Sequence, residues 1–302
     1  MNVLVTGATG VIGSHLLKDC ISRGHQVHYL STNKDKLDSK PNCKGFYWNP
    51  ETGELDSRAF NEVSCIIHLA GATISKRWTK AYKQVILDSR VITANLLYTY
   101  LENNEHSVTH FISASGVGVY PPSLTRLYSE EDSEVDDSFL GEVVQAWERA
   151  ANQFKQLGIK VTKVRTGLVL AKEGGALPAI AAPVRKGVGA PLGSGNQWQS
   201  WIHIDDMIKV YMSILENGWE GKYNAVAPNP VTNKRLTRLI AKTLGKPLWL
   251  PNVPSFFLKL LLGEMSMLVL QGQLVSSKKL EEAGFSFHFF NLQSALDDLL
   301  ID

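Results

Sequence analysis

The chain has 302 residues, of which 44% are hydrophobic, and its 31 Lys and Arg against 29 Asp and Glu give a formal net charge of +2. This near balance argues against an electrostatic nucleic-acid binder, and the length suffices for two domains or one large α/β domain with a buried core. Three cysteines form neither a disulfide framework nor a Cys-x-x-Cys metal site, which favours a reducing compartment. No signal-type segment opens the chain and no apolar run spans a bilayer easily, so we expect a cytoplasmic protein with no membrane partner.

Strand-like and helix-like segments alternate through the first half of the chain. Apolar runs predict strands at 3–5, 27–30, 65–70, 111–113 and 161–164, and helical spacing predicts helices at 12–21, 80–100 and 139–157. Repetition of strand, helix and strand predicts a parallel sheet covered by helices, with right-handed crossovers. The expected fold class is α/β, a Rossmann-like doubly wound parallel sheet.

The pattern changes after Arg165. Residues 183–195 are rich in Gly and Pro, which predicts either a connector between domains or a loop that covers a substrate. Helical patterns return at 234–244 and 254–270, before a Phe-rich end. We therefore expect a second, smaller α/β domain that is mostly C-terminal.

The segment Thr6–Gly13 carries the strongest chemical signal. Its sequence Thr-Gly-Ala-Thr-Gly-Val-Ile-Gly follows an apolar strand and begins an amphipathic helix, as a dinucleotide fingerprint requires. The first glycine permits a sharp turn, the second lets backbone N–H groups approach a pyrophosphate, and the third lets helix and strand pack closely. A tight turn without a ligand is the alternative. The residues expected to hold the dinucleotide here are Gly7, Thr9, Gly10, Val11, Ile12 and Gly13.

The end of the second predicted strand indicates which dinucleotide is bound. An NAD site usually has Asp or Glu there, whereas this chain has Ser31, Thr32, Asn33 and Lys34, with Asp35 the nearest acid. Hydroxyl, amide and ammonium groups suit a 2′-phosphate that a carboxylate would repel. The sequence favours NADP(H); a solvated basic turn is the alternative.

Further motifs make a family visible. With the fingerprint and the strand ending in Leu69, Ala70 and Gly71, the chain resembles extended short-chain dehydrogenase/reductases. More closely it resembles an atypical branch labelled epimerase family protein, sometimes called SulA-like cell-division inhibitor. The motifs that carry this resemblance are Arg77-Trp78, Ser89-Arg90, Ser113–Ser115, Trp147–Ala151, Arg165–Gly167, Gly193–Gln197, Trp201–Asp206, Asn224–Pro228, Gly263-Glu264, Gly272-Gln273 and Gly284-Phe285.

The resemblance covers nearly the whole chain and implies a domain organisation. Residues 1–165 are expected to form the NADP(H)-binding Rossmann domain, which also receives 198–228. Residues 166–302 are expected to form a smaller substrate-side domain that includes the family's C-terminal segment at about 249–302.

The resemblance also implies individual contacts. Cofactor contacts are expected from Leu69, Ala70, Gly71, Arg90, Ser113 and Val169, although Arg90 alternatively forms a surface ion pair. Substrate contacts are expected from Arg77, Trp78, Gln197 and Trp201, and the Arg77 guanidinium would suit an anionic group.

The chain departs from the superfamily at its usual catalytic pair. Typical members use Tyr-x-x-x-Lys, in which Lys lowers the pKa of the phenol that exchanges a proton with the substrate. None of the nine tyrosines has Lys four residues later. Leu140 and Val144 stand where the pair would be, counting back from Glu148, and neither can move a proton.

Two substitutes for that pair are expected. Ser115 follows a predicted strand, where a hydroxyl would face the crevice of the sheet and bond a substrate oxygen, and Tyr120 would donate a proton. The alternatives are a turn hydroxyl for Ser115 and an anchored loop aromatic for Tyr120. We expect Trp147 to lie in the core and Glu148 to be solvated or to form a structural ion pair.

Metal binding is not expected. His203 and Asp205 share one side of an extended segment, but no further His or Cys lies nearby and Asp at a helix start is ordinary capping. His68 sits on a buried-type strand, which favours a hydrogen-bonded core histidine.

The leading functional hypothesis is an NADP(H)-dependent oxidoreductase or epimerase-like enzyme, acting on an unknown small molecule as a monomer or homodimer. The alternative is a non-catalytic NADP(H)-dependent sensor or regulator, linked to cell division or redox state. The missing pair favours the alternative, and the second domain favours an enzyme.

Overall fold

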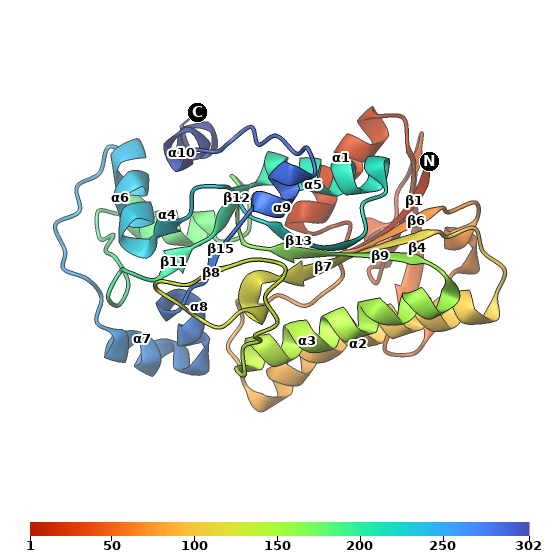
Figure 1. Ribbon diagram of the computed structural model, residues 1–302, viewed down its shortest axis with the longest axis horizontal. Helices are drawn as coiled ribbons and strands as arrows, with labels where there is room; N and C mark the ends of the chain where they lie inside the picture. Colours follow the sequence, from red (N-terminus) through yellow and green to blue (C-terminus); the bar gives the residue numbers. More distant parts are fainter. Residues whose placement is uncertain (302) are drawn as a thin grey trace.

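A twisted parallel sheet forms the centre of the computed structural model, which describes residues 1–301 (Figure 1). Its parallel strands are β1 (Asn2–Thr6), β2 (Gln26–Ser31), β4 (Cys43–Asn49), β6 (Cys65–His68), β7 (His110–Gly116), β9 (Lys160–Thr166) and β13 (Gly221–Ala225). They lie in the order β13-β9-β7-β6-β1-β2-β4, and the short antiparallel strands β3 (Ser39–Lys40) and β5 (Glu54–Leu55) pair with β4. The strand order reverses beside β1, which creates a crevice at the carboxyl ends of β1 and β6.

Helices cover both faces of this sheet. On one face α1 (Val11–Ser22) packs against α5 (Ile204–Asn217), and on the other α2 (Lys80–Asn103) packs along α3 (Phe139–Asn152) (Figure 1). Successive side chains of a strand point to opposite faces, so Val3 and Val5 enter the core under α1 and α5 whereas Leu4 enters the core under α2 and α3. Burial on both faces explains the unbroken apolar runs in the sequence.

The remaining segments build a smaller lobe beyond the carboxyl ends of the strands (Figure 1). Its helices are α4 (Leu177–Arg185), α6 (Asn233–Thr243), α7 (Ser255–Leu262), α8 (Met267–Leu270) and α10 (Leu292–Leu300), whereas α9 (Lys278–Glu282) packs against β13 at the edge of the main sheet. Three small strand pairs join it to the sheet domain: β10 (Leu168–Leu170) with β12 (Trp201–His203), β11 (Trp198–Gln199) with β14 (Val231–Thr232), and β8 (Leu127–Tyr128) with β15 (Leu274–Val275). Between these pairs the chain returns to the main sheet as α5 and β13, so it crosses between the two parts more than once.

The Rossmann-like parallel sheet is confirmed, and the differences from the predicted elements have local causes. The single helix expected at 254–270 is divided into α7, a 3-10 turn and α8, because Gly263 adopts a φ of 59°. Residues 183–185 belong to α4 rather than to a loop. The sequence missed β4, whose apolar residues are interrupted by Lys44 and Gly45. None of the helices within residues 1–301 has the length and hydropathy that crossing a bilayer requires.

Candidate functional site

A cavity of about 500 Å³ lies at the carboxyl ends of the central strands. Gly7 after β1, Leu69 after β6, Ser115 in β7 and Thr166 in β9 all line it. This is the edge at which open α/β sheets bind their ligands. The topology therefore brings together residues that are far apart in the sequence.

The turn beneath the cavity requires glycine at positions 7 and 13. Gly7 adopts a φ of 68°, and a Cβ there would stand 2.6 Å from the Leu69 carbonyl oxygen. A Cβ on Gly13 would stand 2.2 Å from the Gly7 carbonyl oxygen, so the helix could not approach the strand. Gly10 is the N-cap residue of α1 and offers no capping side chain, and the first helical residues, Val11 and Ile12, also line the cavity. Free N–H groups of a helix start thus border a space that fits a dinucleotide pyrophosphate.

A second cavity of about 620 Å³ lies on the other side of Gly7. Ser31 and Thr32 line it, and so do Tyr47 and the acidic residues Glu51 and Asp88. Beside this cavity the Asn33 side chain caps the short 3-10 turn Lys34–Lys36, accepting from the Asp35 N–H at 2.9 Å, and the Lys34 ammonium lies 4.4 Å from the centre of the Tyr47 ring. The tip of β2 thus carries hydroxyls and a cation but no carboxylate in residues 31–34.

The predicted cofactor residues divide between the two cavities. The first is lined by Gly7, Gly10, Val11, Ile12, Gly13, Leu69 and Arg90, and the second by Gly7, Thr9, Ser31, Thr32, Ala70 and Gly71. Asn33, Lys34, Ser113 and Val169 line neither cavity. Ser113 is buried and its hydroxyl donates to the Ala114 carbonyl, while Val169 packs against the core and its neighbour Leu168 faces the first cavity.

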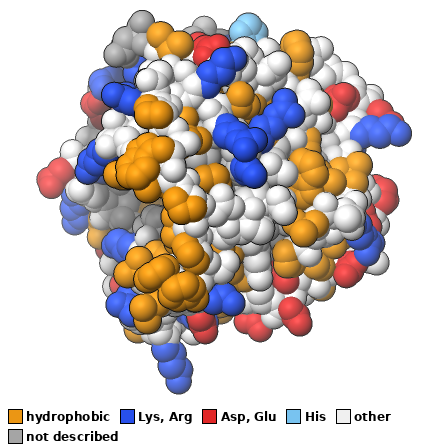
Figure 2. Space-filling model, turned by 90° about the vertical axis from the view of Figure 1, so that its left-hand side faces the viewer, with side chains coloured by type: hydrophobic (Ala, Val, Ile, Leu, Met, Phe, Trp, Pro, Cys, Tyr) orange, Lys and Arg blue, Asp and Glu red, His pale blue; other side chains and the backbone are white. Residues whose placement is uncertain are grey.

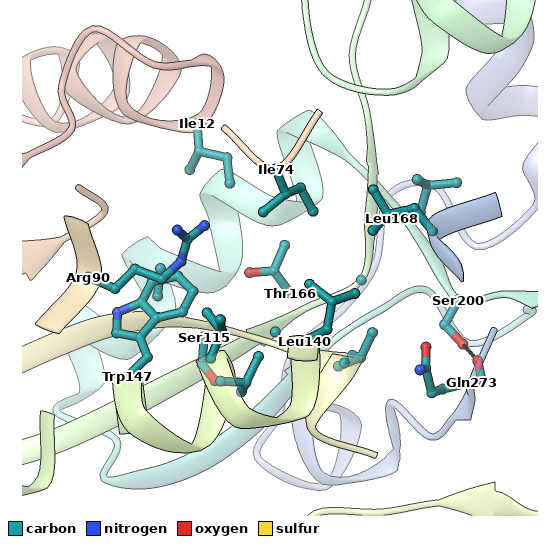
Figure 3. Close-up of a pocket in the computed structure, with 18 of the residues that line it drawn as sticks. Ile12, Ile74, Arg90, Ser115, Leu140, Trp147, Thr166, Leu168, Ser200 and Gln273 are labelled. Carbon is teal, nitrogen blue, oxygen red and sulfur yellow. Dashed lines mark hydrogen bonds between the residues drawn. The ribbon is translucent and has the colours of Figure 1, made fainter. Parts of the chain in front are cut away.

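Arg90 supplies a cation to the first cavity. Its guanidinium donates to the Ile86 carbonyl at 2.8 Å and to the Ala72 carbonyl at 3.2 Å, and it lies 4.9 Å from the centre of the Trp147 ring (Figure 3). Within residues 1–301 no carboxylate pairs with Arg90, which excludes the alternative of a surface ion pair. Burial lowers the pKa of Arg90 to about 10. The Trp147 Nε1–H is also buried without a partner, so this wall offers unsatisfied donors to an anionic or carbonyl ligand.

Ser115 lines the cavity, but a buried ion pair fixes its hydroxyl. The Ser115 Oγ donates to Glu148 at 2.8 Å, and Glu148 also accepts from Arg165 Nε at 2.7 Å and Nη2 at 3.0 Å. Burial alone would raise the pKa of Glu148, but the hydrogen bonds and charge of Arg165 outweigh it and hold that pKa below its ordinary value. The Glu148 carboxylate thus forms the structural ion pair that was one of its two expected roles. Because it takes the only hydroxyl proton of Ser115, the serine presents lone pairs to the cavity.

Tyr120 does not reach the cavity, and the proton-donor role predicted for it is not supported by its position. The residue is fully buried, its hydroxyl donates to Asn224 Oδ1 at 3.0 Å and it accepts from Arg165 Nη1 at 2.7 Å. Burial raises the pKa of Tyr120 above its ordinary value. The anchored-aromatic alternative describes this phenol better, because both of its hydrogen bonds are used within the protein.

Two apolar side chains occupy the wall where the superfamily's catalytic pair would stand. Leu140 and Val144 lie on α3, one turn apart, and both line the first cavity (Figure 3 labels Leu140). Val143 and Trp147 extend this apolar wall along the helix. The α3 side of the cavity is thus apolar and presents no side chain that exchanges protons.

The residues predicted to contact substrate do not line the cavity. Arg77 is exposed, and Trp78 is buried against Phe139 with its Nε1 donating to the Ile74 carbonyl at 2.9 Å. Gln197 ties two segments together, donating to the carbonyls of Leu192 at 3.0 Å and Val269 at 2.7 Å. Trp201 is fully buried, and its Nε1 donates to the Asn229 carbonyl at 2.9 Å. Trp78, Gln197 and Trp201 thus have structural roles in packing and hydrogen bonding, and Arg77 lies outside the cavity.

Another wall of the first cavity comes from residues that neighbour Gln197 and Trp201 and from the C-terminal segment. It consists of Trp198, Gln199, Ser200, Met267, Leu268, Gln271, Gly272 and Gln273. The Ser200 hydroxyl donates to the Gln273 carbonyl at 2.8 Å and joins the two segments (Figure 3). In the sequence, the motif Gly272-Gln273 was the available signal for this wall. The structure explains the glycine, because a Cβ at Gly272 would stand 1.9 Å from the Trp198 carbonyl oxygen. Residues 183–195, in contrast, contribute nothing to the cavity lining, so they do not cover a substrate there.

The two histidines singled out in the sequence, His68 and His203, have structural roles. His68 is fully buried, with Nδ1 2.8 Å from Thr6 Oγ1 and Nε2 3.2 Å from Thr93 Oγ1, and burial lowers its pKa to about 4. His203 caps α5 by accepting from the Asp205 N–H at 3.1 Å. In the part of the chain that the structure describes, no group of three or more His, Cys, Asp and Glu side chains is arranged to hold a metal ion.

The doubly wound sheet, the glycine turn and the crevice beside it define a Rossmann-like protein of the short-chain dehydrogenase/reductase type. The sequence model of the NAD dependent epimerase/dehydratase family matches residues 3–226, and the chain belongs to that family. A domain of unknown function, DUF1731, matches residues 253–299. The resemblance inferred from the motifs is therefore confirmed.

Full-length relatives share this organisation. An epimerase family protein of Staphylococcus epidermidis is 38% identical over 300 residues, covering 98% of both chains, and epimerase family protein YfhF of Bacillus subtilis is 36% identical over 303 residues, covering 100% of this chain and 99% of its own. The crystal structure of human epimerase family protein SDR39U1 with NADPH matches with a TM-score of 0.85 and 30% identity, covering 99% of each chain.

Proposed function

We propose that the protein is an NADP(H)-binding oxidoreductase or epimerase-like enzyme that acts on a small molecule. The observation that carries this proposal is that two cavities meet at the glycine turn, with Gly7 lining both. A dinucleotide with its pyrophosphate at the start of α1 would place its adenosine half in the cavity beside β2 and its nicotinamide half in the cavity beside β7.

Three observations support NADP(H) over NAD(H). Ser31 and Thr32 line the adenosine-side cavity, and Lys34 lies beside it over Tyr47. The related human structure contains NADPH. Glu51 and Asp88 line the same cavity, but neither is at the tip of β2, where an acidic residue would select NAD.

When bound, the nicotinamide would supply or accept a hydride, and the protein would bind, orient and shield the reacting groups. Arg90 would hold an anionic or carbonyl group, because its charge has no internal partner. Leu140, Val144 and Trp147 would exclude water from the reacting face. Ser115, whose proton is taken by Glu148, would accept a hydrogen bond from a substrate hydroxyl and so fix its orientation.

The test has a binding stage and a turnover stage. Titration of the purified protein with NADPH and NADH, followed by nicotinamide fluorescence, is expected to show at least tenfold tighter binding of NADPH. Turnover of NADPH is then followed against a library of carbonyl metabolites for the wild type and Ser115→Ala, with Ser113→Ala as the matched control. Ser115→Ala is expected to slow the reaction by about tenfold or more, in the range of one lost positioning hydrogen bond. Equal rates for the two variants would contradict the role of Ser115, and tighter binding of NADH would contradict the cofactor assignment.

A non-catalytic NADP(H)-dependent sensor is the second candidate, favoured by two observations. The wall of α3 presents Leu140 and Val144 where proton transfer would be expected, and the hydroxyl proton of Ser115 is held by Glu148. A sensor would bind NADPH tightly, oxidise it with no member of the library, and change its affinity for a partner protein on binding.

A further inference from the structure

The smaller lobe carries a positive charge that the composition of the whole chain conceals. Residues 174–204 and 231–263 contain eight Lys and Arg and no Asp or Glu, so the rest of this nearly neutral chain is net negative. Seven of these cations are exposed, and none forms an ion pair with a residue in the range 1–301. They are Arg185, Lys186, Arg235, Arg238, Lys242, Lys246 and Lys259. Of the acids on α10 packed against α6, Asp297 accepts from Thr243 and Asp298 lies 3.2 Å from His203.

The same lobe exposes a helix that is apolar on nearly all sides. Of the eight residues of α7 only Leu258 is buried, while Phe256 is 63% exposed, Leu260 76% and Leu261 71%. A helix with apolar residues all around its axis is normally enclosed by protein or lipid. Lys259 is the only charged residue of α7.

Further exposed apolar residues continue this surface. Trp249 is 69% exposed and its Nε1 donates to the Gly187 carbonyl at 3.0 Å, beside Val188, which is 52% exposed. The chain from Trp249 to α7 then runs along the loop after α4, with the Gly193 N–H donating to the Val253 carbonyl at 2.9 Å. Figure 2 looks at this end of the molecule: hydrophobic side chains form a band with Lys and Arg beside it, and Asp and Glu lie mostly toward the edges of the view.

We propose that this face, formed by α7, Trp249, Val188 and the surrounding Lys and Arg, docks on the surface of an anionic phospholipid membrane. Exposed Leu, Phe and Trp would enter the boundary between headgroups and acyl chains, and the cations would contact the anionic headgroups. A second copy of the chain would set this positive face against itself, and a nucleic acid would use the charge but leave the leucines of α7 exposed. Peripheral docking needs no membrane-spanning segment, so it is compatible with the absence of a spanning helix within residues 1–301. The expectation from the sequence that the protein has no membrane partner considered only spanning segments.

Vesicle co-sedimentation of the full-length protein tests this proposal. Phosphatidylcholine vesicles are compared with vesicles containing about one third phosphatidylglycerol, at low and at high salt. Two double variants remove the two contributions separately: Leu260→Ser with Leu261→Ser, and Arg185→Glu with Lys186→Glu. Leu124→Ser and Lys44→Glu are controls at exposed positions outside this face, and the melting temperature of each variant establishes that it is folded.

The wild type and both controls are expected to sediment with anionic vesicles, to release at high salt, and not to sediment with phosphatidylcholine. Each double variant is expected to bind at least tenfold more weakly, because one loses two cations that would face anionic headgroups and the other loses two apolar side chains that would enter the lipid. The proposal is overturned if the wild type does not sediment with anionic vesicles, or if both folded double variants bind these vesicles as tightly as the wild type does. It is also overturned if the wild type is a dimer that the leucine substitutions convert to a monomer without affecting sedimentation, since the face would then be a subunit interface.

Discussion

Replacing Glu148 with Gln is expected to destabilise the protein strongly, although the substitution preserves shape. Glu148 is 9% exposed and compensates Arg165, which is 5% exposed, through two hydrogen bonds of 2.7 and 3.0 Å. Lys163 stands 3.6 Å away, so two cations would be left in a buried place without an anion. Breaking a buried pair by removing one partner costs about 3–5 kcal/mol. With an unfolding entropy of about 2 cal/mol/K per residue, this corresponds to a fall in melting temperature of roughly 5–8 °C for a chain of this length.

The pH dependence of that loss separates charge from shape. Arg165 holds the pKa of Glu148 below its ordinary value, so the stabilisation is complete above the ordinary carboxyl pKa and is lost as the pH falls through the folded one. Thermal unfolding of the wild type and Glu148→Gln at pH 7 and again below pH 4 is therefore expected to show a deficit that shrinks in acid. Glu142→Gln, an exposed change in the first turn of the same helix, is the control. A deficit under 1 °C at pH 7, or one that persists unchanged in acid, would refute the buried ion-pair reasoning.

Three further predictions concern the glycine turn, a buried histidine and cofactor choice. Gly13→Ala places a Cβ 2.2 Å from the Gly7 carbonyl oxygen, so NADPH binding by fluorescence titration is expected to weaken at least tenfold, whereas Ser14→Ala should leave it unchanged. The pKa of His68 is about 4 in the folded state, below its ordinary value, so near pH 5 only the unfolded chain binds this proton. The free energy of unfolding, measured with urea, should therefore fall by about 2 kcal/mol between pH 7 and 5, and by less in His68→Gln. An identical pH dependence of this free energy in both proteins would disprove the reasoning. Thr32→Asp would place a carboxylate at the tip of β2 and should shift the NADPH to NADH affinity ratio toward NADH by about tenfold or more, as one repelled phosphate contact implies, whereas Thr99→Asp on the exposed face of α2 should not.

The sequence by itself determined the features that depend on local backbone constraints. The alternation of apolar strands and amphipathic helices predicts the parallel sheet, because burial on both faces demands unbroken apolar runs. The structural roles of Gly7 and Gly13 can be inferred from the sequence motif alone, because a left-handed φ at one position and a close helix–strand contact at the other both exclude a side chain. The absence of a Tyr-x-x-x-Lys pair is likewise a property of the sequence alone.

Only the tertiary structure decided which side chains face the cavity. Trp201 and Gln197 lie within a few residues of Ser200, yet it is Ser200 that lines the cavity, because orientation along an extended segment depends on what packs against each face. Ser115 and Glu148 are 33 positions apart, and their hydrogen bond exists only because α3 packs across β7. The apolar α7 illustrates the same limit outside the site: its sequence predicts a helix within 254–270, and only the fold shows that its apolar side chains are exposed.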